Sequence, residues 1–431
     1  MIKGPLMPFC SKIQRRHLIK QGLFLSLIAV PLLGSSAELC SPDTTITDPL
    51  IYRENLEYIG AFRIPEGIHG DSAATYTEGP ITLGPDGKSI FLVGKSRDQA
   101  IGELSIPELV NSTTLNDLNM ASVIQPFREV IDRPQTGNTQ NIDRIGGMEY
   151  VDGELIVNVY EYYDAIDEAE HTTLVVRDAA NLATSPVDGY HEYPVAAHAS
   201  GWISPIPENL QALLGGTHIT GNSKASPIIS RYSVGPSAFV INPAQHIIGG
   251  RSPTTIPTST LLDFSLDNPL GDRENRGMDY LNNDDHTNDL WTRISRAAYG
   301  FIAPGTNTYV TIGWSGGHTS GVGYKITQDN GDLCPGPCSY EVADNYNYYW
   351  LWDLNDLIAV QNGQKLAHKI EPYAYGEFVT PFQSASLAEI LGGAFDSATN
   401  ILYLTLYGAD VEQNRYERLP VIVAYKLAPP P

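Results

Sequence analysis

One pattern of apolar and polar positions recurs five times along the chain: a small residue, a short apolar run, a turn and a second apolar run. The copies lie at residues 78–94, 146–159, 201–216, 299–313 and 392–406. Each run has the length of a strand, and Gly, Pro, Asn or Asp residues separate the runs. Each copy therefore predicts a β-hairpin.

Two further apolar segments follow most of these hairpins. A third strand with a polar tail is expected at 101–110, 172–183, 237–247, 348–360 and 419–427, and a fourth at 121–130, 188–195, 259–266 and 369–378. The fifth unit reaches the C-terminus without a fourth strand. Residues 56–65, LEYIGAFRIP, match the fourth-strand pattern and precede the first hairpin. We expect this N-terminal strand to complete the last unit.

Four-stranded units arranged in a ring, with the two ends paired, leave no open sheet edge, and this arrangement resembles the β-propeller fold. We predict an all-β chain with five four-stranded blades, closed by pairing of the N- and C-terminal strands. Gly147 and Gly201 are 54 residues apart, whereas Gly201 and Gly300 are 99 apart. That wider interval leaves six or seven blades as an alternative.

The N-terminus predicts export. Residues 1–37 carry five positive charges, no acidic residue and the apolar run GLFLSLIAVPLL, followed by Ser35 and Ala37 at the positions that signal peptidase requires. Arg15 and Arg16 resemble a twin-arginine signal, with a general secretory signal or a membrane anchor as alternatives. We expect a signal peptide at 1–37, a linker at 38–52, a propeller domain at 53–431, and a secreted or periplasmic protein.

The net charge of the chain limits the classes of partner that we expect. The chain has 49 acidic against 27 basic residues, a formal net charge of -22. We therefore do not expect electrostatic binding to nucleic acid or to an anionic membrane. After removal of the signal we expect a monomer that acts on a polysaccharide. In an oxidising compartment Cys334 and Cys338 predict a disulfide, and the pairing of Cys40 stays open.

The candidate site follows from the register of the predicted blades. The loops before each first strand and after each second strand should open on one face, near the axis. His218 and His318 then take nearly the same register in two blades. Residues expected on this face are His198, His218, Tyr163, Arg144 and Arg296 as catalytic groups, and His318, Arg97, Tyr160, Glu78 and Asp410 as substrate-binding groups.

The preferred activity is β-elimination on a uronate-containing polysaccharide, which the resemblance to propeller-type polysaccharide lyases also implies. His198 or His218 would remove the C5 proton, Tyr163 would act as the acid, and Arg144 or Arg296 would neutralise the uronate. One alternative is a glycoside hydrolase that uses two carboxylates from among Glu78, Asp164 and Asp410. The other is a propeller that binds a ligand without chemistry.

No cofactor is required by any motif. The oxygen-rich segment 279–289 is a Ca²⁺ candidate without EF-hand spacing, and a Zn²⁺ site from His198, His218 and His318 has no support from local spacing. Residues 313–317, GWSGG, fit the serine-elbow motif, which requires a following helix. The next segment has the pattern of a loop and a strand, so a serine hydrolase is not expected.

Overall fold

Five four-stranded antiparallel sheets make up most of the protein, and the computed structural model describes residues 45–223, 228–383, 388–414 and 416–428. Blade 1 consists of β4 (Ile81–Leu83), β5 (Ser89–Val93), β6 (Ala100–Ser105) and β7 (Val123–Glu129). Blade 2 consists of β8 (Arg144–Val151), β9 (Glu154–Tyr160), β10 (Thr173–Val176) and β11 (Val187–His191). Blade 3 consists of β12 (Ile203–Pro205), β13 (His218–Thr220), β14 (Ala238–Ile241) and β15 (Ser259–Leu262).

The last two blades contain insertions or a strand from the other end of the chain. Blade 4 consists of β16 (Arg296–Ile302), β17 (Thr308–Gly316), β20 (Asn345–Asp353) and β21 (Ala374–Glu377). Blade 5 consists of β22 (Ile390–Asp396), β23 (Ile401–Asp410), β24 (Leu419–Leu427) and β1 (Leu56–Arg63). Two small hairpins lie outside the blades: β2 (Ile68–His69) with β3 (Ser72–Ala73), and β18 (Val322–Tyr324) with β19 (Pro337–Ser339).

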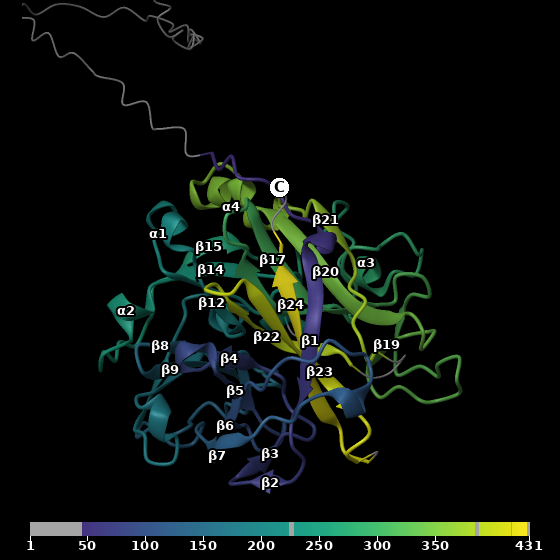
Figure 1. Ribbon diagram of the computed structural model, residues 1–431. Helices are drawn as coiled ribbons and strands as arrows, with labels where there is room; N and C mark the ends of the chain where they lie inside the picture. The colour runs from purple at the N-terminus through teal and green to yellow at the C-terminus, as the bar shows by residue number, and fades with distance from the viewer. Residues whose placement is uncertain (1–44, 224–227, 384–387, 415, 429–431) are drawn as a thin grey trace, which may run out of the picture. The chain divides into compact units, whose positions relative to one another are not determined.

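The first strands of the blades line a common axis. Contacts join β4 to β8, β8 to β12, β12 to β16, β16 to β22, and β22 back to β4. Four of these strands, β4, β8, β12 and β22, are labelled in Figure 1. This closed ring confirms the predicted five-bladed β-propeller. No further four-stranded sheet occurs in the described ranges. The interval of 99 residues between Gly201 and Gly300, which left room for more blades, holds the outer strands of blade 3 and then an irregular segment with the short helix α3 (Met278–Asn282).

The two ends of the described chain meet in blade 5. β1 pairs with β24 in antiparallel register, from Leu56 opposite Leu427 to Arg63 opposite Val421. The predicted closure of the ring by terminal strands is therefore confirmed. Such closure removes the unpaired edge that an open sheet would present.

Close approach between neighbouring blades explains the small residue in each repeat. A Cβ atom added to Gly147 would lie 2.2 Å from the carbonyl oxygen of Gly201, and one added to Gly392 would lie 2.2 Å from that of Gly79. Only glycine fits at this separation. Gly147 and Gly392, which align two of the sequence repeats, are therefore points where neighbouring inner strands touch.

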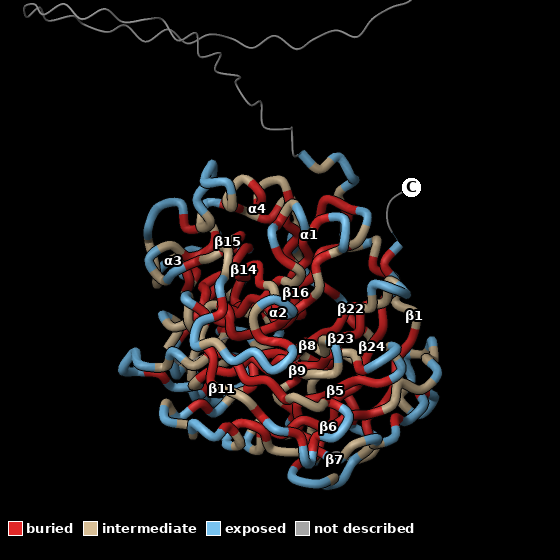
Figure 2. The backbone as a smooth tube through the Cα atoms, turned by 90° about the vertical axis from the view of Figure 1, so that its left-hand side faces the viewer, coloured by how far each residue is buried: buried red, intermediate tan, exposed pale blue. Residues whose placement is uncertain are grey.

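The strand interiors form the core, and the connecting loops carry most of the exposed positions (Figure 2). Trp350, Trp352, Tyr309 and Phe301 are among the large side chains with almost no exposure. Apolar side chains that alternate along a strand pack between successive blades.

Three of the four α-helices in the described residues occupy segments that the sequence pattern assigned to strands or tails, and α3 lies in the long segment before the fourth hairpin. The four helices are α1 (Glu208–Leu214), α2 (Pro243–His246), α3 (Met278–Asn282) and α4 (Leu354–Gln361). The prediction was wrong for the third hairpin, whose second apolar run is α1. Leu210 and Leu214 lie four residues apart on the buried side of this helix, and Gly215 ends it at a φ of 73°.

Several predictions concern the N-terminal segment or the cysteines. The predicted signal peptide at 1–37 and Cys40 lie outside the described residues. A disulfide joins Cys334 to Cys338, which confirms that pairing. In the described part of the chain, no helix has the length and apolar character needed to cross a membrane.

Candidate functional site

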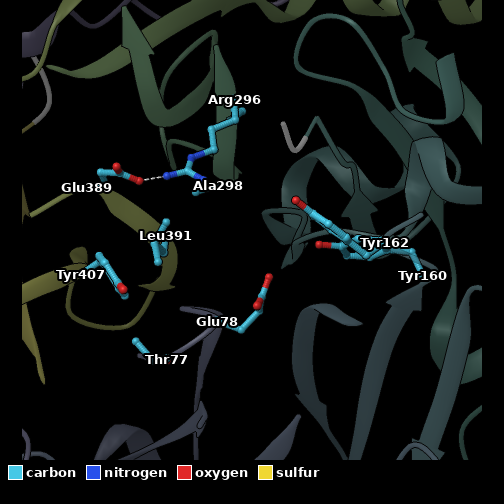
Figure 3. Close-up of a pocket in the computed structure, with 10 residues that line it drawn as sticks. Thr77, Glu78, Tyr160, Tyr162, Arg296, Ala298, Glu389, Leu391 and Tyr407 are labelled. Carbon is cyan, nitrogen blue, oxygen red and sulfur yellow. Dashed lines mark ion pairs between the residues drawn. The ribbon is translucent and has the colours of Figure 1, made fainter. Parts of the chain in front are cut away.

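A pocket lies on the axis at the end where the inner strands begin (Figure 3). Its cavity volume is about 240 Å³, and its lining comes from blades 1, 2, 4 and 5. The residues are Thr77, Glu78, Tyr160, Tyr162, Arg296, Ala297, Ala298, Glu389, Leu391 and Tyr407. They belong to loops before first strands, to the starts of first strands, or to the ends of second strands and the turns after them, which is the face that the register predicted.

Two glutamates and an arginine provide the charge in this pocket. Arg296, the first residue of β16, forms an ion pair with Glu389, which directly precedes β22. The Nε atom of Arg296 is buried and has no hydrogen-bond partner among the described residues. Burial lowers the pKa of Arg296, and the negative charge of Glu78 opposes that shift. Arg296 is therefore a desolvated cation between carboxylates from two blades.

Glu78 enters the pocket from the loop before β4 and has a looser set of neighbours. Its Oε2 atom lies 4.0 Å from Nε of Arg144 and 3.5 Å from Nε2 of Gln99. The side chain of Glu78 is 16% exposed, so it is shielded but open to the cavity. Glu78 and Glu389 thus lie in one cavity with different cationic neighbours.

Gln99 holds this corner of the pocket together. It is buried and adopts a φ of 47°, which is uncommon for a residue other than glycine. Its side-chain oxygen accepts a hydrogen bond from the backbone N–H of Ile145 at 2.6 Å, and its Nε2 donates to the carbonyl oxygen of Ser96 at 2.7 Å. Gln99 therefore fixes the loop of blade 1 against the inner strand of blade 2, beside Glu78.

Three tyrosines form the aromatic part of the wall. Tyr160, the last residue of β9, is buried and packs edge-on against Tyr232 at 5.4 Å between ring centroids. Tyr162 is 37% exposed, and the guanidinium of Arg144 lies 4.7 Å from its ring centroid. Burial raises the pKa values of Tyr160 and Tyr407. Both phenols therefore remain protonated at neutral pH and can donate hydrogen bonds.

Four of the predicted site residues lie in or beside this pocket. Glu78, Tyr160 and Arg296 line it, and Arg144 contacts both Glu78 and Tyr162 at its edge. The register of the repeats was sufficient to bring these residues together.

Other predicted residues lie on the loops but not in the pocket lining. Tyr163 is 60% exposed in the turn after β9, and Arg97 is exposed in the turn between β5 and β6. His198 lies before β12 with its Nδ1 atom 2.5 Å from Oδ1 of Asp263. The imidazole of His198 is thus engaged with the outer part of blade 3.

The predicted position of His218 was wrong. His218 is the first residue of β13 and pairs with Pro205, the last residue of β12, so it lies at the opposite end of the blade from the pocket. The error follows from α1, which displaced the second strand of blade 3. Burial lowers the pKa of His218 to about 4. Because His218 begins β13 whereas His318 follows the end of β17, the two histidines do not share a register.

His318 is held inside the insertion of blade 4. Its Nε2 atom lies 2.7 Å from the hydroxyl of Ser315, and its Nδ1 donates to the carbonyl oxygen of Asn288 at 2.8 Å. Ser315 is fully buried within β17, and a loop and β18 follow it, as expected. The serine-elbow arrangement is absent from this described segment.

The other two carboxylates of the hydrolase alternative have structural partners. Asp410 is fully buried and accepts hydrogen bonds from Nε and Nη2 of Arg63 at 2.7 and 3.1 Å. Asp164 is buried with Nε of Arg231 at 3.4 Å from its Oδ2. Neither lines the pocket.

No group of three or more His, Cys, Asp or Glu side chains is placed to hold a metal ion within the described ranges. In the Ca²⁺ candidate segment, Asp285 is paired with Arg276, and the Asn283 amide donates to the carbonyl oxygens of Gly317 and His318. These polar groups connect loops of blades 3 and 4. The three histidines of the Zn²⁺ candidate lie in separate surroundings.

Sequence reasoning missed Glu389, Thr77, Leu391 and Tyr407 as pocket residues. Glu389 precedes Gly392 by three residues, much as Arg144 precedes Gly146 by two. That offset from the hairpin glycine could have identified it. It was missed because the loop before the fifth hairpin was not considered.

Comparisons with known proteins find likeness in the fold alone. No protein-family model matches this chain, and no curated protein sequence matches it. A solved structure described as Bacteroides ovatus Xyloglucan PUL GH43B is 10% identical with a TM-score of 0.37, over 80% of this chain and 50% of that one. The chain therefore spans half of the length of that protein.

Two shorter solved structures match over nearly their whole length. The catalytic domain of a Coprinopsis cinerea GH62 α-L-arabinofuranosidase is 10% identical with a TM-score of 0.35, over 86% of this chain and 98% of that one. An α-L-arabinofuranosidase of Podospora anserina, solved with cellotriose, is 10% identical with a TM-score of 0.31, over 86% and 97%.

Proposed function

We propose that this protein is a glycoside hydrolase in which Glu78 and Glu389 are the catalytic carboxylates. The observation that carries the proposal is that glutamates from blades 1 and 5 share one tyrosine-lined pocket on the propeller axis. Glycoside hydrolysis requires two carboxyl groups on either side of the scissile bond, one to donate a proton and one to activate water or attack the sugar.

We assign the role of base to Glu389 from its ion pair with Arg296, and the role of acid to Glu78 as the second carboxyl group of the pocket. An ion pair with the partly buried Arg296 favours the ionised carboxylate, so in this proposal Glu389 accepts the proton of the attacking water. Glu78 donates its proton to the glycosidic oxygen as the bond between that oxygen and the anomeric carbon breaks. The water oxygen becomes the new hydroxyl of the released sugar. Glu389 then releases its proton to solvent and Glu78 takes one up, which restores both residues for the next cycle.

The remaining lining suits a sugar. Protonated Tyr160 and Tyr407 can donate to hydroxyl groups, Arg296 offers further donors, and the Tyr162 ring provides an apolar face at the opening. Pockets of this kind combine aromatic surface with a few placed polar groups.

β-Elimination on a uronate is the second candidate, because Arg296 and Arg144 could neutralise a sugar carboxylate. Elimination also requires a general base, and the pocket offers none of those predicted. His198 and His218 are not in the pocket lining, and burial raises the pKa values of the pocket phenols Tyr160 and Tyr407. A proton donor is a poor base. The hydrolase is therefore preferred.

The test is hydrolysis of arabinan, xyloglucan, alginate and polygalacturonate by residues 38–431, followed by mass spectrometry of the products. We expect products that have gained water, and loss of about 10²–10⁴-fold in kcat in both Glu78→Gln and Glu389→Gln. Glu108→Gln, the same change at an exposed position, serves as the matched control and should retain full activity.

The outcomes separate the candidates. Products that lack one water at the non-reducing end would establish elimination instead. If none of the polysaccharides is cleaved, and wild type and both glutamine variants bind one of them equally well, the protein would be a binding propeller and the proposal would be overturned.

A further inference from the structure

The pocket ends in a floor a short way along the axis. Directly beyond Glu78, Ala298 and Leu391, the inner strands of all five blades converge on a space of about 10 Å³. The residues around it include Pro80, Gly147, Trp202, Tyr299 and Gly393. A cavity needs about 10–15 Å³ to hold a single water molecule. The axis is therefore closed to any sugar.

This floor is rigid because backbone atoms form it. Cβ atoms built on Gly146 and Gly147 would lie 2.0 and 2.2 Å from carbonyl oxygens of the next blade, so the inner strands already touch. Each inner strand is also paired with the second strand of its own blade. Opening the floor would require separation of the blades, so a glycan cannot pass through the axis.

The walls surround the cavity on several sides. Thr77 and Glu78 come from blade 1, Tyr160 and Tyr162 from blade 2, Arg296 from blade 4, and Glu389 and Tyr407 from blade 5, and Figure 3 shows them around a common space. Four of the five blades thus contribute to the walls, and the floor closes the cavity at the axial end.

The volume limits what can enter. Pockets for drug-sized ligands span about 300–1,000 Å³, and this one has about 240 Å³. The volume lies below that range, and we take it to hold one sugar ring rather than two consecutive rings. Tyr162 lines this volume and is 37% exposed, so part of its ring faces solvent.

We infer that the protein is exo-acting: it accepts only the terminal unit of a glycan chain or side chain and releases single sugars. This inference rests on the proposed hydrolase function and specifies its substrate class. Glu78 and Glu389 then act at the bond that joins the enclosed unit to the rest of the glycan, which remains outside the pocket.

The experiment follows the products of oligosaccharides labelled with a fluorophore at the reducing end, prepared from arabinan and xyloglucan. An exo-acting enzyme shortens the labelled ladder by one unit at a time, releases a monosaccharide as the first small product, and leaves the viscosity of the parent polymer unchanged at low conversion. Oligosaccharide release with a rapid fall in viscosity would overturn the inference and leave the hydrolase proposal intact. Absence of hydrolysis on every substrate would overturn both.

A second variant tests the pocket itself. Ala298 lines both the pocket and its floor, so Ala298→Leu should fill part of the volume for the terminal sugar and lower kcat/KM at least tenfold. Ala180→Leu makes the same change at an exposed position and is the control. An Ala298→Leu protein with wild-type kcat/KM and an unchanged melting temperature would show that the terminal sugar does not enter this pocket.

Discussion

Three carboxylates of this protein show how local surroundings decide what an acidic residue does. Asp410 is fully buried and paired with Arg63, so it is a structural anchor. Glu389 is partly open to the pocket and paired with Arg296, so it is available to a ligand. Glu149 on β8 accepts a hydrogen bond from the Thr82 hydroxyl at 3.1 Å and has no ion pair among the described residues.

Glu149 should make stability depend on pH. Burial raises its pKa to about 8, whereas a glutamate in an unfolded chain has a pKa of about 4.3. Between these values the folded state binds more protons than the unfolded state, so the free energy of unfolding decreases as pH rises through this window. Glu149→Gln should therefore be more stable than wild type at pH 8, with little difference at pH 4.

Thermal unfolding of both proteins between pH 4 and 9 measures this effect. The exposed Glu108→Gln variant is the control for loss of one negative charge. Curves for Glu149→Gln and wild type that run parallel across the range would contradict the assigned pKa.

At the scale of the element, the inner strands are the most constrained parts of the fold. They carry the glycines at which blades touch, and they also begin at the pocket, so packing and site geometry depend on the same segments. Outer strands and long loops have more freedom, as the helix α3 and the hairpin β18–β19 in the connections show.

Gly147→Ala should destabilise the protein strongly. The new Cβ would lie 2.2 Å from the Gly201 carbonyl oxygen, a backbone atom that cannot move without shifting β12. Overpacking of this kind costs about 1–3 kcal/mol, and a backbone contact belongs at the upper end. Gly336→Ala meets no atom within 4 Å and is the matched control. Urea unfolding measures both variants. Equal midpoints for Gly147→Ala and Gly336→Ala would show that close contact between inner strands does not require glycine at position 147.

At the scale of the whole molecule, stability depends on closing the ring. β1 joins a blade whose other strands come from the far end of the sequence, and the ion pair between Arg63 and Asp410 adds a polar link at that junction. Because unpaired edges invite association with other chains, loss of this closure should lead to aggregation as well as unfolding.

Arg63→Met should lower the free energy of unfolding by about 3 kcal/mol, because it leaves the buried Asp410 carboxylate without its cation, although the Gln413 amide and the Glu412 backbone N–H still donate hydrogen bonds to it. The exposed pair Lys365–Asp356 offers a comparison, since removal of such a surface pair changes stability by about 0–1 kcal/mol. Denaturation of Arg63→Met and Asp356→Ala measures both. Equal, small effects would show that the closure does not depend on the buried pair.

Much of the fold could be predicted because the propeller repeats one physical requirement. Each inner strand needs a small residue where it touches the next blade, and this produces a glycine at the start of nearly every hairpin. The third hairpin failed because a short apolar run fits a helix as well as a strand, and only packing of Leu210 and Leu214 decides between them. That local error also misplaced His218.

The sequence by itself predicted the order of the strands in the blades, the pairing of the terminal strands, the disulfide, and the presence of Glu78, Tyr160 and Arg296 on one face, while it left the number of blades between five and seven. These features follow from periodicity and register, which are local properties. Only the tertiary structure decided that Glu389 completes the pocket, that Asp410 is locked by Arg63, and that the axis is closed below Ala298. Those outcomes depend on distances between residues far apart in the chain, which no local pattern contains.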